Sequence, residues 1–521
     1  MRQTVAEPAS ASAREITIEP VTRIEGHARI GIRLDESGNV AEARVHIMSM
    51  RGFEKFIEGR AAEEVPGIVT RICGICPWQH HLASNKAVDG CFGSEVPPAG
   101  RLLRELTQVL AHISDKVLHF FFLAGPDFFV DSHQCAAGNI MKIAAQAPEL
   151  AKRVIEMRYR GQMMLEKFAG RAIHPDAIVP GGFSKPMSRP EREQLHADAL
   201  DQLDFARFAL DFAKERVFSR FDAGLMQLGE INTGFLGMVN PEDGGLELSD
   251  GILRLMRPDG TFHEFLGREY TDFIGEHVEP WSYAKFPYAR VWGEGFSMLL
   301  DDPRGIYRTN CLARINVADF IRTPLAQAEL LEFRSLFGRP AQSTILYHWA
   351  RLIELLYACE KVIELLEDPA ITDQQVRYDV VPKAGRGVGC VEAPRGTLIH
   401  DYSTDENGLI TRANLIVGTT HNMAPINMSV NRVARDLIKD GEVTGEALNR
   451  IEMAVRAYDP CISCATHRLD GGKTIEVSVS DANGILIEGA PLKAPSLVID
   501  RSGKASRMSA AHSALRGIPS A

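Results

Sequence analysis

Two Cys-x-x-Cys elements near opposite ends of this chain place the strongest constraint on its fold. They contain Cys73 with Cys76, and Cys461 with Cys464. Each element offers two soft sulfur ligands, and two elements together can supply the four sulfurs of one tetrahedral or distorted tetrahedral metal site. Zinc ribbons place their pairs roughly 15–20 residues apart, whereas 385 positions separate Cys76 from Cys461. A local zinc module is therefore disfavoured, and a shared site requires the two ends of the chain to meet.

Composition narrows the class of protein further. A formal net charge of −10 argues against nucleic acid or an anionic membrane surface as the partner. The total of nine cysteines is odd, and the five outside the two pairs have no regular spacing. This usage suits metal chemistry in a reducing compartment better than a disulfide framework. We therefore expect a cytoplasmic location.

The sequence contains no membrane-span signal. No stretch approaches the roughly 18–20 consecutive apolar residues of a membrane helix. Residues 1–14 are small and polar and lack an apolar core, which predicts a disordered leader and not a secretory signal.

Hydrophobic periodicity predicts an α+β fold with a mainly helical core. Alternation over 16–50, broken by a turn at 35–39, predicts an N-terminal β-hairpin. Helical periods follow over 101–124, over 147–168, and in a third long helix that the capping box of Ser188 and Glu191 opens. We expect these helices to form a long-helix bundle, with small antiparallel sheets at the hairpin and in peripheral lobes.

The second half of the chain mixes both patterns. Residues 224–319 predict an irregular α+β lobe, 344–367 a long helix, and 382–418 a glycine-rich segment that contains strands. Helices are predicted over 427–439 and 445–458, and the second ends where Pro460 disfavours helix in the residue before it. Residues 468–521 carry one strand-like alternation at 475–479 and look appended to the domain.

The cysteine pairs leave several interpretations open until other residues are considered. One pair alone is more often a structural zinc half-site, or two small buried apolar side chains. Two pairs, each followed closely by a histidine (His80 and His467), favour a shared metal centre. Such histidines typically lie in the second shell of a metal or bind a second metal.

Five sequence blocks together resemble the large subunit of nickel-iron hydrogenases. The resemblance extends over roughly residues 15–467, and is closest to the methyl-viologen-reducing branch linked to heterodisulfide reductase. The blocks are Glu19-Pro-Val-Thr-Arg-Ile-Glu25-Gly-His27, Arg51-Gly-Phe-Glu54, Arg71-Ile-Cys73-Gly-Ile-Cys76-Pro-Trp-Gln-His80, Glu392-Ala-Pro394-Arg395-Gly and Asp459-Pro-Cys461-Ile-Ser-Cys464-Ala-Thr-His467.

The resemblance implies a nickel-iron centre on the four cysteines. Cys73 and Cys461 correspond to terminal nickel ligands, and Cys76 and Cys464 to ligands that bridge nickel and iron. His80 corresponds to a second-shell residue. One carbon monoxide and two cyanide ligands are implied on the iron.

A pocket for those diatomic ligands is implied as well. Pro394 and Arg395 match one of its sides, and a guanidinium suits anionic cyanide nitrogens because it is a permanently charged fork of donors. Val417 and Thr419 match the other side, where Gly418 stands in place of a proline common in the family. Without the family, Arg395 would be interpreted as a surface residue after a proline turn.

Heterolytic cleavage of hydrogen releases a proton, which requires a base. By resemblance the base is the Cys461 thiolate and Glu25 is the first relay, with Asp115 and Asp459 as the acidic residues near Arg395. The alternatives are an exposed strand residue at Glu25 and an ordinary helix pair of Asp115 with His119.

A magnesium site and a processing site are also implied. Glu54, the carbonyl of Leu415 and His467 correspond to magnesium ligands, and magnesium prefers such oxygen-rich coordination. The family precursor is normally cut after the residue matching His467, which here precedes 54 residues. We therefore expect a domain over 15–467 and a C-terminal extension over 468–521 that is removed in maturation; a flexible accessory tail is the alternative.

We accordingly predict the catalytic large subunit of a nickel-iron hydrogenase. Its expected partners are a small iron-sulfur subunit, heterodisulfide reductase or other electron-transfer subunits, a maturation endopeptidase and nickel chaperones. The alternatives are a hydrogen sensor with the same centre, and a non-catalytic scaffold like the quinone-binding subunit of complex I. Since that scaffold has lost the metal cysteines, their presence here discriminates against it.

Overall fold

The computed structural model describes residues 15–47, 52–129, 144–145 and 147–462. It also describes four short C-terminal strands at 476–480, 486–487, 497–499 and 505–507. The predicted leader, Arg51, Cys464 and His467 lie outside the described residues.

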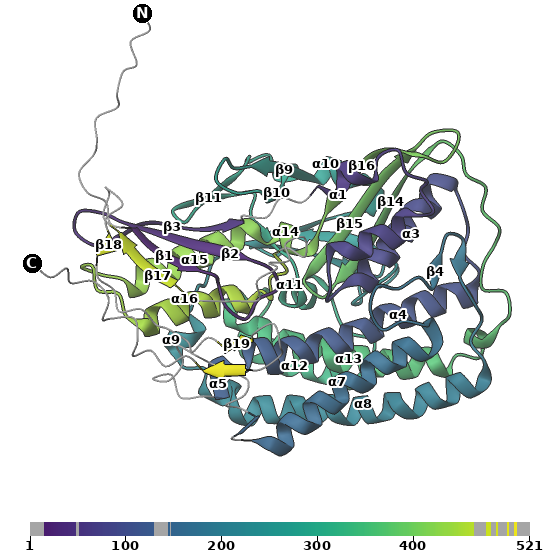
Figure 1. Cartoon of the computed structure of the whole chain (residues 1–521), viewed down its shortest axis with the longest axis horizontal. Coiled ribbons are helices and arrows are strands. Elements are labelled where there is room, and N and C mark those ends of the chain that lie inside the picture. Colours follow the sequence, from purple (N-terminus) through teal and green to yellow (C-terminus); the bar gives the residue numbers. More distant parts are fainter. Residues whose placement is uncertain are drawn as a thin grey trace, which may run out of the picture.

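Long helices form one layer of the molecule, where Figure 1 shows them running alongside one another. They are α4 (Pro98–Val117), α7 (Pro148–Ala169), α8 (Arg189–Arg216), α12 (Pro324–Phe337) and α13 (Tyr347–Glu367). The predicted capping box is present at the start of α8. The layer confirms the predicted α+β fold with a helical core. Among the described residues, no helix is both long and apolar enough to cross a membrane.

The predicted helix over 101–124 changes character within its length. It is α-helical to Val117 and continues as a π-helical segment, η2 (Leu118–Ala124). Wider helical turns of this kind are rare and often occur at functional sites. Asp115 lies in the last α-helical turn before the change.

The N-terminal sheet contains the predicted hairpin. Strands β1 (Glu15–Glu19), β2 (Ala28–Leu34) and β3 (Val40–Ile47) are antiparallel neighbours. The alternation in the C-terminal region forms β17 (Glu476–Ser480), which pairs with β1 and continues the sheet to β18 (Leu486–Ile487). The sheet therefore joins strands from both ends of the chain.

Helix α3 (Pro77–Phe92) lies directly on a glycine face of a second sheet. That sheet contains β14 (Gly385–Ala393), β15 (Gly396–Thr404) and β16 (Ile410–Ile416) in antiparallel order. A Cβ atom on Gly387 would lie 1.9 Å from the Ala87 carbonyl oxygen, and one on Gly389 would lie 1.8 Å from that of Ala83. Glycine at alternate positions of β14 thus lets the helix backbone touch the strand backbone.

The predicted irregular lobe has a four-stranded sheet at its centre. Its strand order is β13 (Tyr307–Arg308), β6 (Gly234–Val239), β7 (Ile252–Met256), β8 (Phe262–Phe265). The two-stranded pairs are β4 (Ile178–Val179) with β5 (Gly182–Phe183), β9 (Ile274–Val278) with β10 (Lys285–Ala289), β11 (Ser297–Leu299) with β12 (Asp302–Arg304), and β19 (Leu497–Ile499) with β20 (Ala505–Arg507).

Shorter helices complete the framework around these layers. They include α1 (Phe53–Ile57), α2 (Val65–Val69), η1 (Thr70–Ile72), α5 (Pro126–Phe129), α9 (Ala223–Met226), α10 (Tyr270–Phe273), α11 (Cys311–Val317), α14 (Gly418–His421), α15 (Met423–Leu437) and α16 (Gly445–Ala457). Helix α15 begins four residues before the predicted start at 427. Its Pro425 lies in the first turn, where the missing N–H has no intrahelical acceptor and costs nothing.

The glycine face of β14 generates a stability prediction. Gly389→Ala places a methyl group against the Ala83 carbonyl oxygen, so α3 must move away from the sheet. We expect the free energy of unfolding to fall by about 1–3 kcal/mol, measured as the change in urea midpoint. Gly67→Ala in α2 is the control, because a Cβ there meets nothing within 4 Å. Equal effects of the two changes would contradict the proposed close packing.

Candidate metal centre

Three cysteine sulfurs from distant parts of the chain converge. The Sγ atoms of Cys73, Cys76 and Cys461 all lie within 4.8 Å of one another, and those of Cys73 and Cys461 are 3.2 Å apart. Cys73 and Cys76 are buried. Cys464 lies outside the described residues, so the structure places three of the four predicted sulfurs.

Backbone contacts hold the two cysteine segments in place. The amides of Ile75 and Cys76 point at Cys73 Sγ, at 3.4 and 3.1 Å, in the turn between η1 and α3. On the other side, the Cys461 amide donates to Thr419 Oγ1 at 2.9 Å, and the Ile462 amide donates to the Glu25 carbonyl at 2.9 Å. The C-terminal segment is therefore tied to the N-terminal one at the site itself.

Crowding of the sulfurs changes the proton affinity of Cys76. Its hydrogen bond with Cys461 lowers the pKa, but its bond with Cys73 and its burial raise the pKa more, and the result lies well above the usual value. A metal bound here would have to displace thiol protons, as metal binding to cysteine generally does. Three soft donors at these separations fit a thiophilic transition metal.

Glu25 is the carboxylate beside the cysteines. Its Oε2 lies 3.0 Å from Cys461 Sγ, which is the predicted position of a proton relay. Glu25 comes from the segment between β1 and β2, and Gly26 after it adopts φ +82°. The structure therefore places Glu25 at the site and not on an exposed strand.

A buried ion cluster surrounds Arg395. Arg395 Nη1 contacts Asp115 at 2.8 Å, and Nη2 lies 3.3 Å from Asp459. Burial lowers the pKa of Arg395, but the two carboxylates raise it more, so the guanidinium stays charged. Burial raises the pKa of Asp459 to about 7. His119 Nε2 lies 3.9 Å from Asp459 Oδ1, so the predicted helix pair of Asp115 and His119 converges on the same cluster.

Asp459 reaches this cluster because the backbone turns at the end of α16. It adopts φ +52°, a left-handed conformation that aspartate tolerates better than most residues. Pro460 follows and prevents the helix from continuing. The turn directs Cys461 toward the sulfurs and Asp459 toward Arg395.

Arg314 supports the turn that carries Arg395. Fully buried, it forms a bidentate pair with Glu354 at 2.6 and 2.7 Å and a bond with Glu392 at 2.8 Å. It also donates to the carbonyls of Ala393 at 2.9 Å and Pro394 at 3.2 Å. Sequence patterns alone did not reveal Arg314 and Glu354. The available signal was charge inside the otherwise apolar helices α11 and α13.

The other predicted pocket residues lie around the same turn. Val417 precedes α14, and Thr419 lies within it beside Cys461. A Cβ atom on Gly418 would lie 2.9 Å from the backbone of Gly396, which explains why glycine occurs there. Arg395 Nε is buried and has no hydrogen-bond acceptor among the described residues.

The predicted magnesium ligands are only partly described. Glu54 on α1 lies near β16, which carries Leu415, and the two elements pack together. Lys285 Nζ is 3.9 Å from Glu54 Oε1 and 2.6 Å from Asn414 Oδ1. His467 lies outside the described residues.

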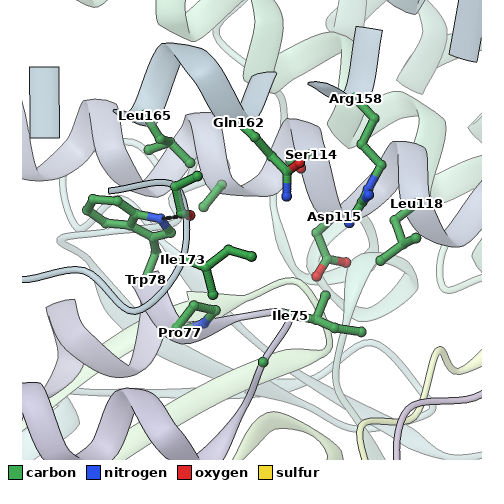
Figure 2. Close-up of a pocket in the computed structure, with 13 residues that line it drawn as sticks. Ile75, Pro77, Trp78, Ser114, Asp115, Leu118, Arg158, Gln162, Leu165 and Ile173 are labelled. Atoms are coloured by element: carbon green, nitrogen blue, oxygen red, sulfur yellow. Dashed lines mark hydrogen bonds between the residues drawn. The ribbon is translucent and has the colours of Figure 1, made fainter. Parts of the chain in front are cut away.

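A small cavity leads toward the cluster. It has a volume of about 50 Å³ and is lined by apolar side chains together with a few polar ones. Figure 2 shows the Asp115 carboxylate directed into it, near Ile75 and Ile173, with Gln162 and Arg158 farther along. Asp115 Oδ1 has no hydrogen-bond partner among the described residues. The cavity is large enough for small molecules the size of water.

His80 is buried on α3, four residues after Cys76, so the two share a helix face. Its Nδ1 lies 3.1 Å from His400 Nε2. His400 was not among the predicted site residues. Two alternate polar residues, His400 and Tyr402, in the buried strand β15 were the available signal.

Comparison with known proteins agrees with this geometry. A family model described as nickel-dependent hydrogenase matches residues 51–159 and 317–467, and one described as HoxL-like matches 15–50. A subunit of the vhu F420-non-reducing hydrogenase of Methanococcus voltae is 46% identical over 82% of this chain and 99% of its own length. The beta subunit of the NAD-reducing hydrogenase HoxS of Cupriavidus necator is 37% identical over 91% of this chain and 99% of its own.

Solved structures give the same result. The crystal structure of an NAD+-reducing NiFe hydrogenase in the H2-reduced state superposes with a TM-score of 0.81 and 40% identity. The match covers 88% of this chain and 100% of that one. Identity at this level over nearly all of the chain establishes more than a shared fold. The chain belongs to the nickel-dependent hydrogenase family, as a catalytic large subunit that activates H2.

Proposed function

We propose that this chain interconverts H2 with protons and electrons at a nickel-iron centre held by Cys73, Cys76, Cys461 and Cys464. The observation that supports this assignment is the convergence of three sulfurs within 4.8 Å from segments 385 positions apart. Nickel and iron on thiolates supply the redox chemistry that activates H2, which zinc lacks. The convergence of the cysteines also argues against a scaffold without metal.

We assign the iron one carbon monoxide and two cyanide ligands, in a pocket formed by Pro394, Arg395, Val417 and Thr419. The buried Arg395 Nε without a protein acceptor among the described residues supports this assignment, because buried donors normally have partners. A cyanide nitrogen would be such a partner. Thr419 accepts from the Cys461 amide and can still donate its hydroxyl proton.

For proton movement we assign Cys461 as the first base and Glu25 as the relay. Their 3.0 Å contact is within the reach of direct proton transfer. Arg395, with Asp115 and Asp459, would hold a fixed positive charge beside the reacting atoms. Such preorganised charge stabilises charge that develops during the reaction.

We further propose a magnesium ion on Glu54, the Leu415 carbonyl and His467. Electrons would pass to a small iron-sulfur subunit, because this chain has no cysteine pattern for clusters of its own. Relatives named as subunits of hydrogenases, with higher identity to the F420-non-reducing ones, support such a partner. Heterodisulfide reductase or another electron-transfer subunit would follow, in the cytoplasm.

Residues 468–521 are, in our proposal, a maturation extension that an endopeptidase removes after nickel chaperones have loaded the site. Its strand β17 is paired with β1, so cleavage after His467 alone would leave this strand held by backbone hydrogen bonds. Removal therefore requires β17 to separate from the sheet.

The central test is metal content. In protein purified from its native host with its partner, we expect about one nickel per chain, iron in excess and about one magnesium. The chain mass should correspond to an end at His467. Cys73→Ala should lose nickel, because it removes one of the converging ligands.

The matched control is Cys359→Ala, another buried cysteine, which lies on α13 away from the cluster. It should keep its nickel. Zinc in place of nickel in the native protein would overturn the proposed centre, and a full-length mass with nickel bound would overturn only the processing step.

The relay assignment predicts the effect of Glu25→Gln. An amide cannot take up and release the proton, so dye reduction by H2 should fall about 10²–10⁴-fold. Exchange of H2 with D2O should fall in parallel while nickel content stays constant. Glu19→Gln, an exposed residue of the same segment, is the control and should be active. Retained exchange in Glu25→Gln would exclude this residue as the relay.

The buried cluster predicts a stability effect. Asp115→Asn keeps the shape but leaves Arg395 with one charge partner fewer. Breaking a buried pair of this kind costs about 3–5 kcal/mol in unfolding free energy. Asp201→Asn, which breaks an exposed pair with Arg160, should cost about 0–1 kcal/mol. Urea unfolding measures both, and similar values would show that the Arg395 charge is not confined as proposed.

A further inference from the structure

A line of buried polar side chains extends from His80 away from the cysteines. His80 Nδ1 lies 3.1 Å from His400 Nε2, and His400 Nδ1 lies 2.6 Å from the Tyr402 hydroxyl. Tyr402 in turn lies 3.1 Å from Ser84 Oγ. All four side chains have 0% exposure.

Two elements build this line from residues on single faces. His80 and Ser84 are four positions apart on α3, and His400 and Tyr402 are two positions apart on β15. The glycine face of β14 brings α3 close to this sheet. The line is therefore fixed by the same packing that positions the Cys73–Cys76 turn.

The line is not built to carry protons to solvent. Ser84, at its far end, is fully buried. Burial also raises the pKa of Tyr402 far above its usual value, so the hydroxyl stays neutral. Neutral groups in a closed line can order one another's hydrogens but do not supply an exit for charge.

The order of the hydrogens then determines the state of His80. When Tyr402 donates to His400 Nδ1, neutral His400 carries its hydrogen on Nε2 and donates it to His80 Nδ1. Neutral His80 must then carry its own hydrogen on Nε2. The opposite order would leave a lone pair at that nitrogen. Thiolate sulfur is an acceptor, so a metal centre on the same helix face as His80 favours the first order.

We propose that Ser84, Tyr402 and His400 are positioning residues that hold His80 in the tautomer with hydrogen on Nε2, so that it donates to a thiolate of the metal centre. The inference rests on the proposed nickel-iron function. It assigns three residues that contact no proposed ligand a role in tuning the centre, because a donor to a metal thiolate withdraws electron density from it.

Tyr402→Phe tests the inference in the purified holoenzyme complex. It removes the hydroxyl that orders His400 and leaves the ring. We expect normal nickel content, an altered nickel electron paramagnetic resonance signal, and a reduction midpoint shifted to more negative potential. Ser84→Ala, one step farther away, should shift the midpoint in the same direction by less.

Tyr270→Phe is the matched control. Tyr270 is also buried, and it donates to Asp401, which lies on the opposite face of β15 from His400 and Tyr402. Its signal and midpoint should equal those of the native complex.

The outcomes separate the two levels of the proposal. Native signals in both Tyr402→Phe and Ser84→Ala, with nickel retained, would overturn the positioning role and leave the hydrogenase function intact. Should Tyr402→Phe fail to fold, Ser84→Ala decides alone. Absence of nickel from the native complex would overturn both.

Discussion

The direct backbone contact between α3 and β14 determines the geometry of the candidate centre. Gly385, Gly387 and Gly389 remove side chains from one face of the strand, and the helix that follows Cys73 and Cys76 lies against that face. The same strand ends at Ala393, immediately before the turn that carries Arg395, and β15 returns from that turn with His400 and Tyr402. A single helix-on-hairpin contact therefore fixes the first cysteine pair, the buried arginine and the line behind His80 relative to one another.

Charge inside this region is tolerated because Arg395 and Arg314 both have carboxylate partners. Arg395 is paired with Asp115 and Asp459, and Arg314 with Glu354 and Glu392. Unpaired, each guanidinium would cost several kcal/mol to bury. The two clusters differ in purpose. Arg314 directs its donors to carboxylates and to the backbone of the Arg395 turn, whereas Arg395 retains a buried donor with no acceptor among the described residues. The first cluster is therefore complete as structure, and the second is complete only with a further acceptor.

Local sequence patterns predicted those parts of the fold that local physics determines. The capping box at Ser188 and the alternation of the N-terminal hairpin indicated correct elements, and Pro460 correctly predicted the end of α16 before Cys461. Patterns could not predict the π-helical segment after Val117, which depends on what packs around it. Nor could they pair Arg314 with Glu354, or His80 with His400, because these partners are 40 and 320 positions apart. The family resemblance supplied the residues at the centre, and tertiary contacts supplied the residues that support them.

The N-terminal segment contacts the chain on both sides of the proposed cleavage position. Glu25 binds Cys461 and Ile462 upstream of it, and β1 pairs with β17 downstream. The two contacts differ in kind. The upstream one joins a side chain and a backbone carbonyl to the metal-binding segment, whereas the downstream one is a strand ladder of backbone hydrogen bonds. If the extension is removed as proposed, the ladder is lost and β1 becomes an edge strand with unpaired backbone groups. The contact at Glu25 would then be the remaining tie between the two ends of the chain at the centre. Release of the extension thus would expose a sheet edge without loosening the cysteines, which is the order of events that closing a loaded site requires.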